Sequence, residues 1–132
     1  MRKRKTLKRT RRVELTVMGL RYRVNRQARD FLSRYTPIPV ELEREPGNAK
    51  DSNAIRVHIG RNFTLKKYRG LHIGYLRALV AEEFAPAIDS GAIVFSECYL
   101  TAIDGDESEM EALMTRRLGK KVKIPLDKSN GY

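Results

Sequence analysis

Apolar and polar residues alternate in several short stretches of the chain. In residues 13–17 the apolar side chains are Val13, Leu15 and Val17, at every second position. The same period of two recurs over residues 38–42 and 55–59, and residues 71–76 and 92–103 are also rich in residues that favour strands. Such alternation is typical of β-strands that bury one face. The sequence therefore predicts about five short strands, and Gly74 within one of them indicates a bulge or a close approach of two backbones.

Two further segments follow the helical period instead. Apolar residues three and four positions apart predict helices over 25–34 and 78–91. Asn25 is a candidate N-cap of the first helix, and Gly91 is the expected C-cap of the second. Pro86 should kink or shorten the second helix.

A third helix is predicted over 107–117. Acidic residues lie in its first turn and Arg116 and Arg117 in its last, which suits the helix macrodipole at both ends. Its exposed face is a candidate docking surface for a protein partner. Residues 119–132 are predicted to be a C-terminal extension with one edge strand, 122–124, before the chain becomes disordered.

Together these elements predict the fold class. Short strands with a few helices, and no regular alternation of strands with long helices, indicate a mainly β fold with helices (α+β), such as a small Greek-key barrel. The 132 residues suit one domain, which we place at 13–118. Its single cysteine, Cys98, is expected to be a buried strand residue. No apolar stretch reaches the length of a membrane span, so no membrane contact is expected.

Most of the net charge of +11 comes from the N-terminus. Residues 1–12 hold no acid and eight basic residues: Arg2, Lys3, Arg4, Lys5, Lys8, Arg9, Arg11 and Arg12. The other 120 residues carry 19 basic and 16 acidic side chains, a net of only +3. A run of like charges repels itself, so we predict a disordered basic tail that binds a polyanion, with nucleic acid the first candidate. A tail that serves only solubility or targeting is the alternative.

Residues 43–57, EREPGNAKDSNAIRV, place a polar turn between two predicted strands. Asn and Asp side chains in turns normally hydrogen-bond nearby backbone, and this accounts for Asn48 and Asp51 individually. It accounts less well for the whole order of Arg-Glu-Pro, then Asn, then Asp, then Asn-Ala-Ile. Arg44 and Glu45 are expected to form an internal pair.

This order of residues resembles the HIRAN domain family. Three further pieces agree with the family in the same order: VMGLRY at 17–22, IGYL at 73–76 and ALVAEEFAPAIDSG at 78–91. With the polar turn they span most of the predicted domain. The resemblance implies a small modified OB-like β-barrel that binds single-stranded DNA. It also implies a pocket for a free 3′ end, between the turn after the first strand and the Asn/Asp loop.

The resemblance further implies roles for individual residues. Arg21 would contact phosphate, Tyr22 would stack on a base, and Asp51 would accept a hydrogen bond from a terminal 3′-hydroxyl. Arg23 and Lys50 occupy positions where aromatic residues are frequent in the family. At these two positions a positive charge replaces a side chain that could stack on a base. The full set expected to bind nucleic acid is Arg21, Tyr22, Arg23, Asn48, Lys50, Asp51, Tyr75 and Arg77.

Residue patterns for catalysis are not found. The sequence has no Gly-rich phosphate loop, no His-containing metal motif and no nuclease-type pattern of Asp followed by Glu-x-Lys. We therefore expect a non-enzymatic module with no cofactor or metal. It would bind nucleic acid in DNA repair, replication-fork handling or mobile-element biology, in the cytoplasm with the nucleoid or, in a eukaryote, in the nucleus. The alternative is a protein-interaction module whose basic tail binds nucleic acid nonspecifically.

Overall fold

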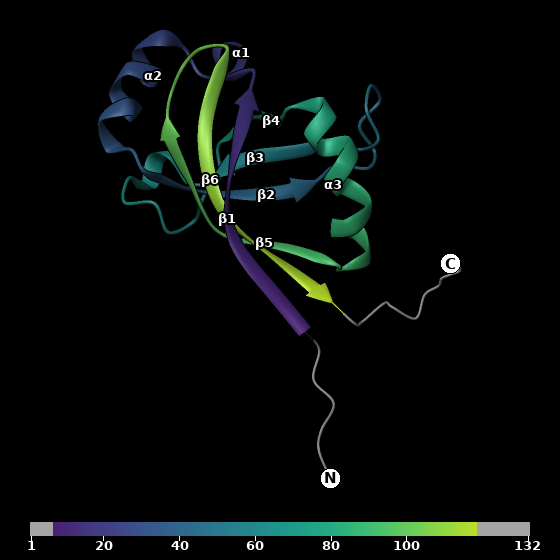
Figure 1. Ribbon diagram of the computed structural model, residues 1–132. Helices are drawn as coiled ribbons and strands as arrows, with labels where there is room; N and C mark the ends of the chain where they lie inside the picture. The colour runs from purple at the N-terminus through teal and green to yellow at the C-terminus, as the bar shows by residue number, and fades with distance from the viewer. Residues whose placement is uncertain (1–6, 119–132) are drawn as a thin grey trace.

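Antiparallel strands close into a barrel in the computed structural model, which describes residues 7–118 (Figure 1). The strands are β1 (Leu7–Met18), β2 (Ile38–Arg44), β3 (Ile55–Ile59), β4 (His72–Leu76), β5 (Ile93–Ala102) and β6 (Glu107–Leu118). Their order around the barrel is β1-β4-β3-β2-β5-β6. The predicted mainly β fold is confirmed, and each of the five strands predicted within residues 13–103 overlaps one of these six.

The barrel consists of two three-stranded sheets that meet at two short corners. β6 pairs with β1 along its full length and with β5, whereas β3 pairs with β2 and β4. The corners, β1 with β4 and β2 with β5, involve two residue pairs each. Figure 1 shows β2 and β3 running across β1 and β6. The buried side chains of both sheets fill the space between them, among them Val17, Ile38, Ile55, Leu100 and Met110.

Short helices occupy the connections between strands. α1 (Leu20–Arg23), α2 (Arg26–Leu32) and the 3₁₀ turn η1 (Ser33–Tyr35) follow β1, the 3₁₀ turn η2 (Lys66–Tyr68) follows β3, and α3 (Ala78–Ser90) follows β4. The helices predicted at 25–34 and 78–91 are confirmed. Asn25 caps α2 by accepting a hydrogen bond from the Ala28 amide at 2.8 Å, and Gly91 ends α3 with a φ of 82°. Pro86 does not shorten α3, which continues to Ser90.

None of the helices among the described residues is long and apolar enough to cross a membrane.

Gly74 lies both at a bulge and at a close approach of two backbones, the two features that its place in the sequence indicated. Val57 lies opposite Gly74 but His58 lies opposite His72, so β4 contains one extra residue, as in a β-bulge. A Cβ atom at position 74 would collide with the backbone oxygen of Met18. Glycine thus allows β4 to approach the end of β1, directly before α1 begins.

The helix predicted over 107–117 is wrong, because these residues form β6. Ser108, Met110, Ala112 and Met114 alternate with exposed or half-buried residues and are at most 1% exposed. Burying one Met side chain stabilises a fold by roughly 1.5–3 kcal/mol, whereas a charge at a helix end contributes about 0.3–1 kcal/mol. Core burial therefore outweighs the charge pattern, and the chain has no exposed helix here to dock a partner.

The disordered tail predicted over 1–12 is also wrong for residues 7–12. These residues extend β1, and they pair with β6 from Leu7 opposite Leu118 to Arg12 opposite Leu113. β6 is long enough to hydrogen-bond the basic segment along its whole length, which composition alone does not reveal. Residues 1–6 and the C-terminal extension 119–132, with its predicted edge strand, lie outside the described residues.

Candidate nucleic-acid interface

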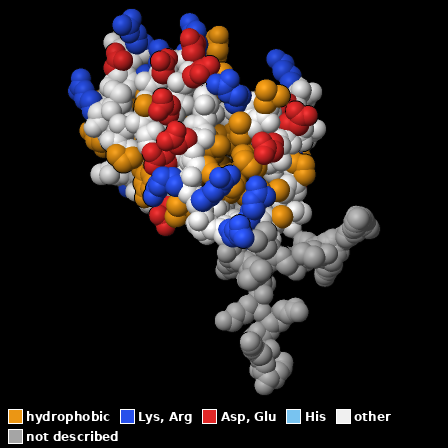
Figure 2. Space-filling model, viewed as in Figure 1, with side chains coloured by type: hydrophobic (Ala, Val, Ile, Leu, Met, Phe, Trp, Pro, Cys, Tyr) orange, Lys and Arg blue, Asp and Glu red, His pale blue; other side chains and the backbone are white. Residues whose placement is uncertain are grey.

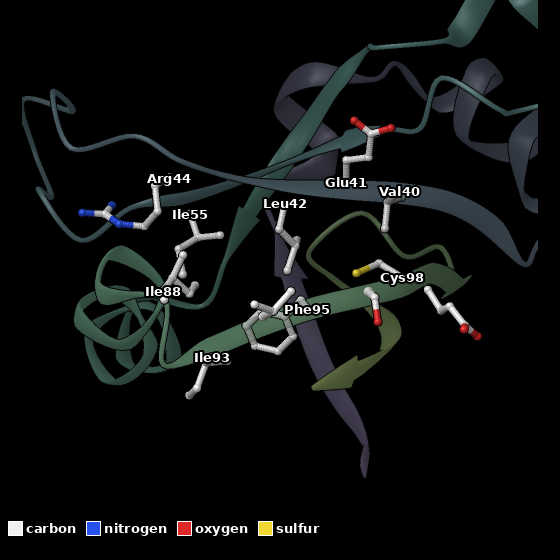
Figure 3. Close-up of a pocket in the computed structure, with 13 residues that line it drawn as sticks. Val40, Glu41, Leu42, Arg44, Ile55, Ile88, Ile93, Phe95 and Cys98 are labelled. Carbon is white, nitrogen blue, oxygen red and sulfur yellow. The ribbon is translucent and has the colours of Figure 1, made fainter. Parts of the chain in front are cut away.

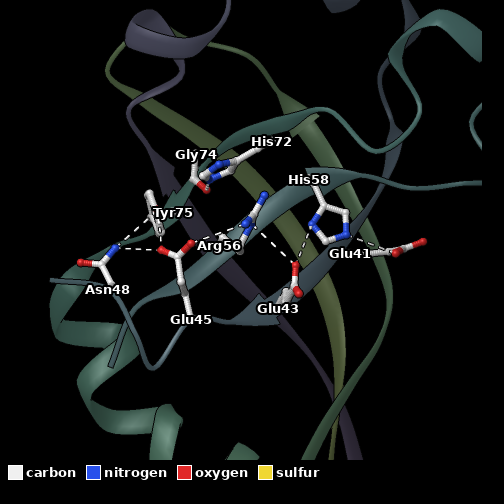
Figure 4. Close-up of polar contacts among 9 residues, drawn as sticks. All are labelled: Glu41, Glu43, Glu45, Asn48, Arg56, His58, His72, Gly74 and Tyr75. Carbon is white, nitrogen blue, oxygen red and sulfur yellow. Dashed lines mark hydrogen bonds and ion pairs between the residues drawn. The ribbon is translucent and has the colours of Figure 1, made fainter. Parts of the chain in front are cut away.

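Tyr75 on β4 connects the two parts of the predicted site. Gly19, with a φ of 88°, turns the chain from β1 into α1. From α1 the Arg23 guanidinium lies over the Tyr75 ring, 5.5 Å from its centre. From the Asn/Asp loop the Asn48 side-chain nitrogen lies 3.5 Å from the Tyr75 hydroxyl (Figure 4). The structure therefore places α1 and the loop beside one another across β4.

Asn48 and Asp51 hold the backbone of their own loop. The Asn48 Oδ1 atom accepts hydrogen bonds from the Lys50 and Asp51 amides, both at 2.9 Å. Asp51 Oδ1 accepts one from the Asn53 amide at 2.9 Å. Asp51 Oδ2 has no hydrogen-bond partner among the described residues and remains available as an acceptor. The structural role that turns usually give to Asn and Asp is therefore present, and it leaves half of the Asp51 carboxylate unused.

Glu45 anchors the loop to the barrel. Its Oε1 atom accepts hydrogen bonds from the Tyr75 hydroxyl at 2.6 Å and from Asn48 Nδ2 at 2.8 Å, and its Oε2 lies 3.4 Å from Arg56 (Figure 4). The hydrogen bond from Tyr75 is the main cause of the lowered pKa of Glu45, and the bond from Asn48 adds to it. The bond between Tyr75 and Glu45 also raises the pKa of Tyr75. The Asn48 side chain thus has both its donor and its acceptor atoms occupied.

Arg44 ties the other end of the loop to α3. Its guanidinium contacts the Asp89 carboxylate at 2.9 and 3.1 Å and donates to the Ala54 carbonyl at 2.8 Å. The expected pair between Arg44 and Glu45 is wrong, because Arg44 is paired with Asp89 and Glu45 with Arg56. Each makes a separate internal contact instead.

The residues of α1 differ in how freely they can meet a ligand. Tyr22 is 83% exposed, with the Arg21 guanidinium 5.6 Å from its ring centre. Arg21 also forms an ion pair with Asp106, and this hydrogen bond raises the pKa of Arg21. Tyr22 therefore presents a bare aromatic surface, whereas a phosphate would have to share Arg21 with Asp106.

Lys50 and Arg77 lie at the edges of the site. Lys50 is exposed on the loop. Arg77 precedes α3 and pairs with Glu107 at 3.2 Å, while its amide donates to the Thr16 carbonyl. Arg77 thus joins β1, α3 and β6, and its charge is already compensated.

Sequence reasoning missed two basic residues beside Tyr75. Arg56 on β3 lies opposite Tyr75, and the His72 ring packs edge-on against it at 4.9 Å. Burial, followed by the charges of Arg23 and Arg56, lowers the pKa of His72. The only signal for this cluster is the β3–β4 register, which one sequence does not reveal. With Arg23, these side chains place three basic groups around one aromatic ring.

A second basic surface, which we name the arginine ladder, consists of Arg9, Arg11 and Arg116. Arg9 on β1 lies directly opposite Arg116 on β6, and a hollow of about 440 Å³ lies between Arg9, Arg11 and Arg116. The ladder residues make no ion pairs within residues 7–118. Figure 2 shows basic side chains at this end of the molecule, next to the grey residues. Like charges facing each other across strands destabilise a sheet, so the ladder is suited to an anionic ligand.

Another hollow, of about 510 Å³, lies elsewhere (Figure 3). It opens where β5 diverges from β2 at a bulge whose residue Glu97 has a φ of 47°. Apolar side chains dominate its lining, and no predicted site residue belongs to it. Cys98 lines it as a buried strand residue, as predicted, and burial raises the thiol pKa to about 11. Across residues 7–118, no three His, Cys, Asp or Glu residues are placed to hold a metal ion.

Comparison with known proteins agrees with this architecture. The family model of the HIRAN domain matches residues 10–126. The crystal structure of the HIRAN domain of human HLTF is similar, with a TM-score of 0.60 and 22% identity over 80% of this chain and 76% of that one. A structure from Lactobacillus plantarum gives a TM-score of 0.54 and 23% identity over 83% of this chain and 99% of that one. No curated protein matches the chain significantly.

Proposed function

The chain belongs to the HIRAN domain family, and from this premise we propose that it binds single-stranded DNA at the site around Tyr22, Tyr75 and Asp51. Members of the family are generally DNA-binding modules. The observation that carries the proposal is the chain of contacts from Arg23 through Tyr75 to Asn48, which makes α1 and the loop one surface. A strand lying across β4 would meet both.

Tyr22 supplies the stacking surface in this proposal. Its ring is almost completely exposed, and stacking of one base on an aromatic side chain contributes roughly 1–3 kcal/mol without reading sequence. The Arg23 guanidinium lies next along the site and suits a phosphate beside that base. Arg56, which is already paired with Glu43 and Glu45, and His72, whose pKa is lowered, contribute less positive charge. Binding should therefore tolerate any base sequence.

Asp51 supplies selectivity for the end of the strand. Its free carboxylate oxygen can accept a hydrogen bond from a 3′-hydroxyl, whereas a 3′-phosphate would be repelled by the same charge. The loop hydrogen bonds of Asn48 fix Asp51 in position. In this proposal Asn48 therefore positions the acceptor, and its side chain does not itself contact DNA.

The proposed activity is binding without catalysis. Such a module would hold DNA ends during repair, replication-fork handling or the movement of mobile elements. Its role would be to place a DNA end for another factor.

The test is fluorescence anisotropy with short single-stranded DNA that ends in either a 3′-hydroxyl or a 3′-phosphate. Tyr22→Leu should weaken binding by at least about fivefold, as expected for the loss of one stacked base. The matched control is Tyr99→Leu on β5, a tyrosine 38% exposed and outside the site, which should bind as the wild type does.

The wild-type chain should also prefer the hydroxyl end. Equal affinity for both ends would contradict the role of Asp51. Unchanged binding by Tyr22→Leu would contradict the location of the site.

A further inference from the structure

An aromatic cluster lies on the surface formed by α2, η1 and η2, outside the site described above. The Phe31 ring centre is 5.2 Å from that of Tyr35 and 6.1 Å from that of Tyr68. Phe31 and Tyr35 are 36% and 38% exposed. A hollow of about 390 Å³ lies beside this cluster, lined by Phe31, Leu65, Lys66, Lys67 and Tyr68. Exposed apolar clusters rimmed by polar residues are a feature of binding surfaces.

The same surface concentrates positive charge. Residues 26–35 and 61–69 contain one acid, Asp30, and seven basic residues: Arg26, Arg29, Arg34, Arg61, Lys66, Lys67 and Arg69. This local net charge of +6 is twice the net charge of all residues after position 12. Within residues 7–118, none of these eight side chains forms an ion pair. The Lys67 ammonium instead lies 5.5 Å from the centre of the Tyr68 ring.

The fold does not require these exposed rings. Leu32 is the fully buried residue of α2, and Phe63, 3% exposed, anchors the facing loop. Phe31 and Tyr35 cover this anchor only in part, because the centre of the Tyr35 ring is 6.1 Å from that of Phe63 and about a third of each outer ring faces solvent. Leucine would provide comparable packing there, so core stability alone does not account for the aromatic choice.

We propose that this aromatic–basic patch, defined by Phe31, Tyr35, Lys66, Lys67 and Tyr68, is a second contact surface for single-stranded nucleic acid. Exposed rings offer stacking to any base, and cations without acidic partners bind phosphates. A basic partner would be repelled, and a neutral one would leave the lysines uncompensated.

The patch continues the proposed DNA site along the chain. α2 begins three residues after Arg23 of α1, and Figure 1 shows α1 and α2 at the same end of the molecule, with α2 on the side away from α3. A strand held at Tyr22 can therefore extend over α2 toward Phe31. The inference rests on the proposed function for the identity of the ligand, and it assigns residues 26–35 a role in binding longer strands.

The experiment compares DNA of two lengths on the full chain. Strands of about 6 nucleotides fill only the first site, whereas strands of about 16 nucleotides, near the upper limit for one OB-type domain, reach the patch. Tyr35→Leu should weaken binding of the long strand by at least about fivefold and leave the short strand and the preference for a 3′-hydroxyl unchanged. Tyr99→Leu, with the same 38% exposure, is the matched control and should change neither.

A charge variant gives a second readout that does not depend on packing. Lys66→Ser combined with Lys67→Ser should make the slope of log affinity against log salt shallower by about 1.4 for the long strand only, at about 0.7 per phosphate contact. Photo-crosslinking with 5-iodouracil along the long strand should label the peptides that contain Phe31, Tyr35 or Tyr68.

The outcomes separate this inference from the proposed function. If Tyr22→Leu weakens both strands while the patch variants bind as the wild type does and the patch is not labelled, the first site stands and the patch proposal is wrong. If only the patch variants lose binding, the first site is wrong and the patch stands. Loss of binding to anionic phospholipid vesicles, or to poly-glutamate, by Tyr35→Leu without any loss for DNA would also overturn the proposal.

Discussion

The Asn/Asp loop and the arginine ladder lie toward opposite ends of β1 and differ in whether their charged side chains are paired. In the loop each buried or half-buried charge has a partner: Glu45 is bonded to Tyr75 and Asn48, and Arg44 to Asp89. In the ladder, Arg9 faces Arg116 and neither has an acidic partner within residues 7–118. The hydrogen bonds of the loop therefore fix the positions of its side chains, whereas the positive charges of the ladder have no acidic partners among the described residues.

The difference suggests how one small barrel can use separate surfaces for affinity for phosphates and for selectivity for one end group. Satisfied polar networks fix the positions of side chains, which selectivity for one chemical group requires. Uncompensated arginines attract any phosphate backbone and lose that attraction as salt rises. We propose that the ladder contributes most of the salt-dependent affinity and that the loop selects the end of the strand.

The largest effect is expected from the ladder. Replacing Arg9, Arg11 and Arg116 with Ser should make the salt slope on single-stranded DNA shallower by about 2, since each lost phosphate contact removes about 0.7. The free energy of unfolding should stay the same or rise, because like charges no longer face each other. Salt-dependent anisotropy and urea unfolding measure the two effects.

Arg12→Ser is the matched control for the ladder, because Arg12 lies on the same strand but is paired with Glu111 at 3.2 Å. It should change the slope by less than one contact. Deletion of residues 1–12 is a poorer test, since it also removes half of β1. A ladder variant with the wild-type slope would show that the phosphates lie elsewhere.

A smaller effect, on stability and selectivity together, is expected from Asn48→Ala. The change removes the hydrogen bonds to the Lys50 and Asp51 amides and to Glu45, and should cost about 1–2 kcal/mol of unfolding free energy. The preference for a 3′-hydroxyl should fall because Asp51 is no longer fixed. Urea unfolding and anisotropy provide the two readouts, and Asn62→Ala at an exposed site is the control. A stable variant with full end preference would separate Asn48 from the site.

The smallest effect is expected from the protonation of His72. Burial and the charges of Arg23 and Arg56 lower the pKa of His72, so its ring is neutral at pH 7 in the free protein. A bound phosphate nearby would raise that pKa, so binding should take up protons and tighten as pH falls through the raised pKa of the bound ring, then level off below the lowered pKa of the free ring. Anisotropy across a pH series should show this trend in the wild type. The trend should be flatter in His72→Gln, and an identical trend there would assign it to another group.

Sequence patterns were sufficient for elements whose local and tertiary preferences agree. The alternation of Ile55, Val57 and Ile59 predicts β3 because the same residues also face the core. The caps Asn25 and Gly91 give the ends of two helices for the same reason. The prediction for β6 was wrong because its acidic residues and arginines have the charge pattern of a helix. Met110 and Met114 are instead buried when β6 pairs with two strands that are distant in the sequence.

The candidate site could be predicted only in part for a related reason. The resemblance indicated Tyr22, Asp51 and Tyr75 as candidate site residues, and the structure brings α1 and the loop together at Tyr75. The contributions of Arg56 and His72 depend on the β3–β4 register, and the pairing of Arg21 with Asp106 joins residues far apart in the chain. Such contacts follow from the closed barrel, which local sequence does not determine.

The division of roles between loop and ladder is tested most directly by one comparison: the ratio of affinities for 3′-hydroxyl and 3′-phosphate strands, measured across a salt series. Asp51→Asn, which keeps an acceptor for the Asn53 amide, should bring this ratio close to one and leave the salt slope nearly unchanged. Glu83→Gln on α3 is the control for removing one negative charge. The ladder variant should weaken both strands equally and keep the wild-type ratio. If instead the ratio survives in Asp51→Asn, or is lost with the ladder, then the loop does not select the end and the account is wrong.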